Sequence, residues 1–233
     1  MLTSSKDSAA EDLLVNAEAA YQGVLGDAQA NRDLAAAVVE RARAIGANEA
    51  LVVGLRAVAW AEHVRLDNDK AKRLLDQAVR LAVAHHLDIR LGEVLVSRAA
   101  VSHELGRLGA AQDDLDRATP LVGPDRGVEV VLQQAALHQN IGRLTDAAGL
   151  YRGVLGRPGC PLDVLVKATN NLALVEVQLG HGSAAIVHID RAVELATGLG
   201  PTLVAMVALL GGVAPVALVQ GVAYAQPPRA GPG

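Results

Sequence analysis

The 233-residue chain contains no phenylalanine and few other aromatic residues, namely Trp60 and three tyrosines. Because half of the residues are nevertheless apolar, the apolar content is mainly alanine, valine and leucine. Alanine and leucine are strong helix formers. The composition therefore predicts an all-α fold with a core of small aliphatic side chains.

The sequence has a single cysteine, Cys160, which excludes an internal disulfide and a zinc site of four thiolates. Cys160 lies in the loop-like sequence RPGCP, and we interpret it as an incidental thiol in a reducing compartment. The polar N-terminal residues lack the apolar segment of a secretory signal. These features favour a cytoplasmic protein.

An excess of basic residues is also missing. The net charge is −4 and the isoelectric point is near 6.0. Nucleic-acid-binding proteins carry a basic face that neutralises phosphates. We therefore expect no nucleic-acid partner.

A pattern of small and large apolar residues recurs along the chain at intervals of 12, 4 and 3 residues. Successive copies are 36 to 40 residues apart, which is typical of stacked helical hairpins. In each copy, small residues let two helices approach closely and a larger residue fills the space beside them. The copies are Ala59, Ala71, Leu75, Ala78; Ala99, Ala111, Leu115, Ala118; Ala135, Ala147, Tyr151, Val154; Ala173, Ala185, Ile189, Ala192; and a fainter one at Gly23, Ala35, Val39, Ala42.

Turn residues separate the expected helices. Gly106, Gly142 and Gly180 are placed to end the first helix of a hairpin, and Asp67, Asn68 and Asp69 are candidates to cap the second helix of another. The sequence predicts a disordered segment at residues 1–8, a helical repeat domain at 9–200, and an interrupted sixth repeat with an Ala/Gly/Pro-rich tail at 201–233.

At these positions the chain resembles the tetratricopeptide repeat (TPR) family, whose units are about 34 residues long. The resemblance implies a right-handed α-solenoid of about five helical hairpins. The units here are longer, and aliphatic residues replace the consensus tryptophan and most aromatics. Phrases such as LGRLGAAQDDLDRA also resemble the repeat region of actinobacterial CHAT-domain (caspase-like) proteins.

In TPR arrays the first helices of the hairpins line a groove that receives a peptide. The resemblance therefore implies a groove in which Trp60 is the lone aromatic anchor, with a partly buried packing role as the alternative. The implied groove residues are Arg56, Trp60, His63, Glu93, His103, Glu104, Glu129, Gln139, Asn140, Lys167, Asn170 and Gln178.

Motifs for catalysis are absent: the sequence has no P-loop, dinucleotide-binding glycine motif, HExxH or G-x-S-x-G. We expect no enzymatic activity, no cofactor and no metal. His63 and His103 share a repeat position, so a metal-binding or pH-sensing pair is the alternative to two side chains on a solvated groove wall.

The chain from Thr202 to Pro228 has no charged residue. Gly211 and Ala223 continue the repeat pattern, but Pro227 would then fall inside the second helix of a sixth hairpin. An interrupted repeat is the preferred interpretation, and a membrane anchor or a disordered tail are the alternatives. An uncapped end of this kind would permit self-association.

The sequence thus predicts a non-catalytic scaffold that binds a protein or peptide in its groove, as the N-terminal repeat part of a larger CHAT-type protein. One alternative is a sensor or oligomerisation module of a bacterial transcriptional regulator. Another is a membrane-tethered TPR adaptor, although a membrane partner is not favoured.

Overall fold

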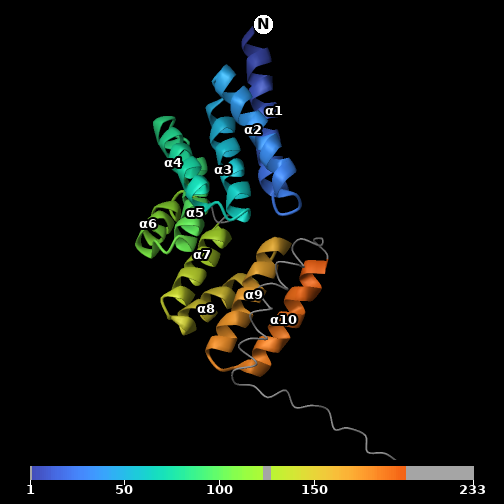
Figure 1. Cartoon of the computed structure of the whole chain (residues 1–233), viewed down its shortest axis with the longest axis vertical. Coiled ribbons are helices and arrows are strands. Elements are labelled where there is room, and N and C mark those ends of the chain that lie inside the picture. Colours follow the sequence, from blue (N-terminus) through green and yellow to red (C-terminus); the bar gives the residue numbers. More distant parts are fainter. Residues whose placement is uncertain (1, 123–126, 198–233) are drawn as a thin grey trace, which may run out of the picture. The chain divides into compact units, whose positions relative to one another are not determined.

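A computed structural model describes the backbone of residues 2–122 and 127–197, and the side chains of this part from residue 7 onward. The described residues form ten α-helices and no β-strand, which confirms the predicted all-α fold (Figure 1). The tail expected at 201–233 lies outside the described residues. The helices are α1 (Leu2–Gly23), α2 (Ala28–Ile45), α3 (Asn48–Val64), α4 (Asn68–Ala84), α5 (Asp88–Glu104), α6 (Leu108–Ala118), α7 (Gly127–Asn140), α8 (Leu144–Leu155), α9 (Leu162–Gln178) and α10 (Gly182–Thr197).

The first helix begins earlier than the sequence pattern suggested. Helix α1 starts at Leu2, and the described backbone of residues 2–8, where the sequence pattern favoured disorder, is helical. The physical reason is that no glycine or proline interrupts residues 2–22. Adding a residue to an existing helix costs much less than starting a new one, so the helix extends beyond its apolar face.

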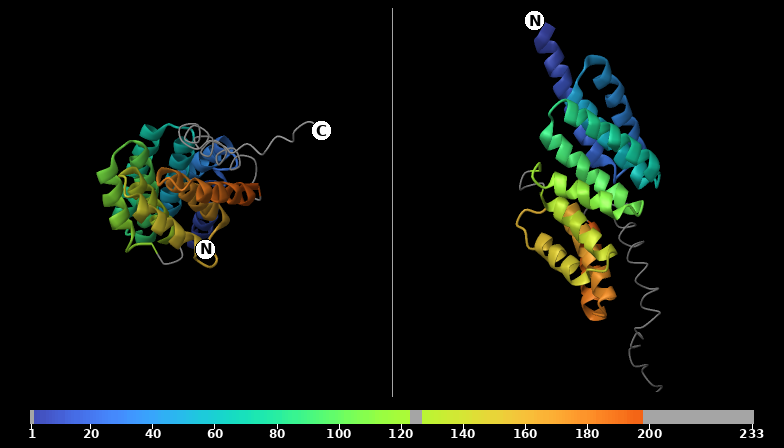
Figure 2. Two further views of the ribbon diagram at one scale, coloured as in Figure 1. Left: turned by 90° about the horizontal axis from the view of Figure 1, so that it is seen from below. Right: turned by 90° about the vertical axis from the view of Figure 1, so that its left-hand side faces the viewer.

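The chain divides into two compact units, Met1–Arg143 and Leu144–Gly233. In the first unit, helices next to each other in sequence form antiparallel hairpins (Figures 1 and 2). In addition, α3 contacts both α1 and α5, and α5 contacts α7. In the second unit, α9 contacts both α8 and α10. The first helices of the hairpins in the first unit therefore form a row of neighbours.

The repeated apolar pattern forms the core of the hairpins. Three of its copies, those that begin at Ala59, Ala99 and Ala135, are entirely buried. In the copy that begins at Ala173, only Ile189 is partly exposed. Gly23 of the faint copy is the last residue of α1 rather than a residue inside it, because the first hairpin turns earlier than the others.

From the second hairpin to the fifth, the turn between the two helices contains a left-handed backbone residue. Gly106, Gly142 and Gly180 have φ of 71°, 79° and 81°, which confirms that they end the first helices. Leu66 occupies the same repeat position with φ of 67°, a conformation in which a side chain is strained. The Asp67 side chain then caps α4 by accepting a hydrogen bond from the Lys70 backbone N–H at 3.1 Å.

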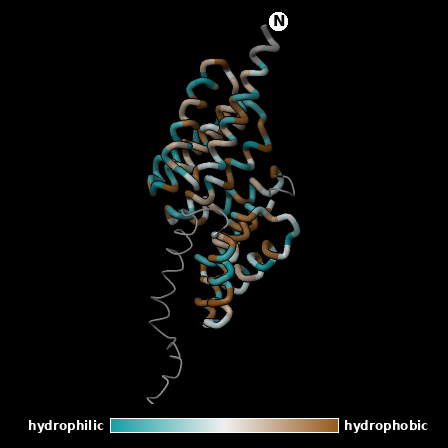
Figure 3. The backbone as a smooth tube through the Cα atoms, turned by 90° about the vertical axis from the view of Figure 1, so that its right-hand side faces the viewer, coloured by the Kyte–Doolittle hydropathy of each residue, from teal (hydrophilic) through white to brown (hydrophobic). Residues whose placement is uncertain are grey.

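Apolar and polar residues alternate along the helices, as the backbone coloured by hydropathy shows (Figure 3). Helices α2 and α4 have one buried face and one face toward water, whereas α3 is buried on all sides from Ala50 to Ala59. Within the described residues, no helix is both long enough and apolar enough to cross a membrane.

Candidate partner-binding face

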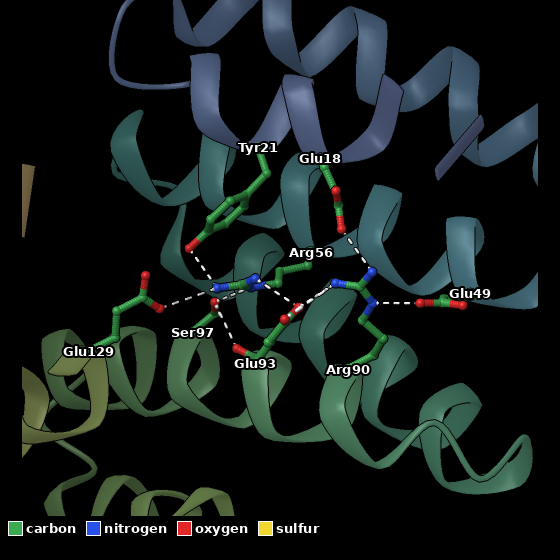
Figure 4. A network of polar contacts seen from close by, with 8 residues as sticks. All are labelled: Glu18, Tyr21, Glu49, Arg56, Arg90, Glu93, Ser97 and Glu129. Atoms are coloured by element: carbon green, nitrogen blue, oxygen red, sulfur yellow. Dashed lines mark hydrogen bonds and ion pairs between the residues drawn. The ribbon is translucent and has the colours of Figure 1, made fainter. Parts of the chain in front are cut away.

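The row of helices α1, α3, α5 and α7 carries a group of polar and aromatic side chains that we call the first-helix face. We define it by Tyr21, Arg56, Trp60, Glu93 and Glu129. Each of the four helices contributes at least one of these residues, and the close-up of this region shows the polar ones pointing toward one another (Figure 4). The repeat spacing places them at neighbouring positions because the helices lie side by side.

Arg56 lies at the centre of this face and is only 4% exposed. Its guanidinium donates to Tyr21 Oη and to Ser97 Oγ at 2.8 Å each, and to Glu93 Oε2 at 3.3 Å. The guanidinium carbon also lies 3.9 Å from the centroid of the Tyr21 ring, a cation–π contact. Glu129 Oε2 lies 3.8 Å from Nη2. Arg56 therefore connects all four helices.

A second arginine, Arg90, completes the network (Figure 4). Its guanidinium donates to Glu18 and Glu49 at 2.8 Å each, and to both carboxylate oxygens of Glu93 at 3.2 and 3.3 Å. Glu93 is 3% exposed and thus lies between two arginines. A buried carboxylate is tolerated only when such partners compensate for the water that it loses.

The structure brings two predicted groove residues, Arg56 and Glu93, into direct contact and buries both. Their charged groups contact other side chains of the chain, so they stabilise the face from within. Sequence reasoning did not find their partners Ser97 and Arg90, because neither stands at a groove position of the repeat. Tyr21 carried a signal, since it is one of only three tyrosines, but it is not among the implied groove residues.

Trp60 lies at the edge of this network and is partly buried. Its ring centroid is 6.2 Å from that of Tyr21 and 4.8 Å from that of His63. The Nδ1 atom of His63 lies 2.7 Å from Asn68 Oδ1, which fixes the imidazole at the start of α4. Trp60 thus packs against neighbouring rings and remains partly exposed.

The C-terminal ends of α5 and α7 carry polar side chains. The side chains of His103 and Asn140 contact each other through Nε2 and Nδ2, while Gln139 is partly buried and Glu104 is exposed. Burial lowers the pKa of His103 below its ordinary value, and the nearby charge of Glu104 opposes this only in part. His63 and His103 therefore have different partners, Asn68 and Asn140. The described residues contain no group of three or more side chains that could together hold a metal ion.

The remaining predicted groove residues belong to the second unit. Lys167 pairs with Asp163 one turn earlier on α9, at 3.1 Å. Asn170 is 3% exposed, and its Nδ2 atom has no hydrogen-bond partner among the described residues. Gln178 is exposed at the end of α9. These three side chains share one helix, α9.

A further buried carboxylate connects successive hairpins outside the first-helix face. Glu62 is 3% exposed and accepts hydrogen bonds from Arg32 of α2 at 2.6 Å and from Lys70 of α4 at 2.8 Å. Burial alone would raise the pKa of Glu62, but the two cations outweigh it and the pKa lies below its ordinary value. Glu176, at the same repeat position in the second unit, pairs with Arg152 and His181.

Comparison with known proteins gives likeness in structure only. No protein family matches the sequence, and no curated protein does. The chain is similar to BtubC (BKLC) from P. vanneervenii, with a TM-score of 0.54, 14% identity, and coverage of 83% of this chain and 92% of that one.

Two further solved structures are similar to the chain. The first, the APC/C hetero-tetramer Cut9-Hcn1, has a TM-score of 0.58 and 14% identity over 83% of this chain and 35% of that one. The chain has a TPR-like α-solenoid fold. A second similar structure is YrrB, described as a TPR protein with an unusual peptide-binding site, with a TM-score of 0.47 and 19% identity over 84% of this chain and 99% of that one. The TPR-like fold accounts for the row of first helices on which the candidate site is built.

Proposed function

We propose that the chain is a non-catalytic scaffold that binds a segment of a partner protein on the first-helix face, with Trp60 as its main anchor. The observation that carries this proposal is the position of Trp60, which is partly buried between Tyr21 and His63 on a row of four helices. Tryptophan residues held in this way are preferred hot spots of protein interfaces.

The arginine network supports the proposal because it fixes the helices before a partner arrives. Arg56 and Arg90 connect α1, α3, α5 and α7 through ion pairs and hydrogen bonds. A face that is already ordered loses little conformational entropy on binding. Exposed or partly exposed polar groups beyond Trp60, such as those of Gln139 and Asn140, can exchange hydrogen bonds with the backbone of a bound segment.

We further propose that this scaffold is the repeat part of a larger CHAT-type protein, as the resemblance of its turn phrases implies. The genomic DNA that follows the reading frame tests this. Protease-like coding sequence there, in any frame, supports the proposal, whereas unrelated neighbouring genes remove it. Coding sequence for a DNA-binding domain would instead favour a transcriptional regulator.

Binding on the first-helix face is testable with displayed peptides. A random peptide library is selected against the immobilised full chain, and the selected peptides are then measured against variants. Trp60→Ala should weaken their binding by roughly 30-fold, the loss expected at a hot spot of about 2 kcal/mol. Val83→Ala is the matched control, because Val83 is an exposed apolar residue of α4 outside this face.

The outcome depends on where the peptides bind. Equal affinity for the wild-type chain and the Trp60→Ala variant would contradict the proposal, as would a loss of equal size in the Val83→Ala variant. Asn140→Ala serves as an independent check of the same face, since Asn140 is exposed and its truncation leaves the buried Arg56 network intact.

A further inference from the structure

Positive and negative charges lie at different depths in the arginine network of the first-helix face. The two guanidinium-bearing side chains are only 5% and 13% exposed, whereas three of the carboxylate side chains are 45% or 46% exposed. The accessible charge of this network is therefore negative. The guanidinium groups are those of Arg56 and Arg90, and the exposed carboxylates are those of Glu18, Glu49 and Glu129 (Figure 4).

The three exposed carboxylates lie at two places along the face. Glu18 and Glu49 each accept a hydrogen bond from Arg90 through Oε1, at 2.8 Å. Glu129 lies next to Arg56 instead, with Oε2 at 3.8 Å from the guanidinium. A carboxylate has two oxygens that together accept about four hydrogen bonds. Each of these partly exposed groups can therefore accept a further donor from outside the chain.

Trp60 stands in line with this network on α3. Glu49 precedes Arg56 by seven residues and Arg56 precedes Trp60 by four, so the three share one side of the helix. The eleven residues from Glu49 to Trp60 span roughly 16 Å of helix, a distance that an extended segment covers in about five residues. A peptide with an apolar side chain on Trp60 can thus place a basic side chain at Glu49.

We propose that the partner segment is basic, with lysine or arginine side chains on the carboxylates of Glu18, Glu49 and Glu129 beside an apolar contact with Trp60. This assignment rests on the proposed function and specifies the chemistry of its partner. Charge complementarity selects this occupant. An acidic segment would need an accessible cation, but the guanidinium groups of Arg56 and Arg90 are covered and already paired with carboxylates.

A test of this assignment must separate local contact from overall attraction. The net charge of the chain is −4, so any basic peptide is attracted at long range. Variants that lose the same charge at different places make the distinction. Glu129→Gln and Glu49→Gln remove a carboxylate of the network, and Glu40→Gln is the matched control because Glu40 is 73% exposed and pairs with Arg43 on α2.

Peptides selected from a random library against the immobilised full chain are the probes. We expect them to contain more lysine and arginine than the unselected library. Their binding is then measured by isothermal titration calorimetry. Glu129→Gln and Glu49→Gln should each weaken binding about threefold, the loss of one partly exposed ion pair, and Glu40→Gln should leave it unchanged.

A double-mutant cycle shows whether the contact is direct. Each basic residue of a selected peptide is replaced in turn by glutamine. At least one replacement should weaken binding about threefold less in Glu129→Gln or Glu49→Gln than in wild type, because its partner is already gone. Additive losses at every basic residue would overturn the assignment.

The outcomes also distinguish this assignment from the proposed function. Selected peptides that need Trp60 but have no excess of basic residues would overturn the assignment alone. So would peptides that bind Glu129→Gln and Glu49→Gln as tightly as wild type. Peptides that bind Trp60→Ala and wild type equally well would contradict the proposed function, and the assignment with it.

Discussion

Replacement of Arg56 by methionine tests whether the arginine network stabilises the fold. Methionine keeps much of the apolar stem and removes the charge. The change leaves Glu93 buried with Arg90 as its remaining cation, and it removes the donor that Tyr21 Oη and Ser97 Oγ share. Breaking a buried ion pair from one side costs about 3–5 kcal/mol. Because Arg90 still contacts Glu93, we expect the lower end of that range.

The free energy of unfolding is measured by urea titration followed by circular dichroism, with the midpoint compared at constant slope. The matched control is Arg43→Met, because Arg43 forms an ion pair with Glu40 in which both side chains are about half exposed or more. Exposed pairs of this kind contribute about 0–1 kcal/mol. The reasoning would be refuted if Arg56→Met shifted the midpoint no further than Arg43→Met does.

Three further predictions concern single residues. Leu66→Gly should raise the free energy of unfolding by about 0.5–1 kcal/mol, because Leu66 is 84% exposed in a left-handed conformation that glycine adopts without strain; a lower midpoint in urea would speak against this. Ala99→Glu should lower the free energy of unfolding by roughly 1–3 kcal/mol or more, because it inserts a charge at a buried helix contact. An unchanged melting temperature would show that the repeat pattern does not place Ala99 at this contact. The pKa of His103 is lowered in the folded state, so its contribution to stability is fully present above its ordinary value of 6.5 and is lost as the pH falls toward the folded value. His103→Gln should therefore flatten the fall in melting temperature between about pH 7 and pH 5; an unchanged slope would contradict the assignment.

The helical hairpins could be predicted from the sequence because their packing depends on residue size at fixed spacing. Ala99, Ala111 and Leu115 are buried as the pattern requires. The glycine turns could also be predicted, because the left-handed conformation that ends a helix is usually adopted by glycine. The start of α1 could not be predicted from its apolar pattern, because helix propagation does not depend on burial alone.

The chemistry of the candidate site was less accessible from the sequence. Arg56 and Glu93 were assigned to the groove by their repeat positions, but their contact spans 37 residues and depends on how α3 and α5 pack. Repeat positions show which face a side chain occupies, whereas the partner across that face follows from side-chain length and burial. The left-handed Leu66 was missed because leucine carries no turn signal.

The most direct measurement is the fluorescence of Trp60, the only tryptophan of the chain, during titration of the full chain with a peptide selected against it. If a partner segment binds over Trp60 on the first-helix face, the emission should change in a saturable way, with the same midpoint as binding measured independently. A peptide that binds specifically and leaves the emission of Trp60 unchanged would contradict the central claim.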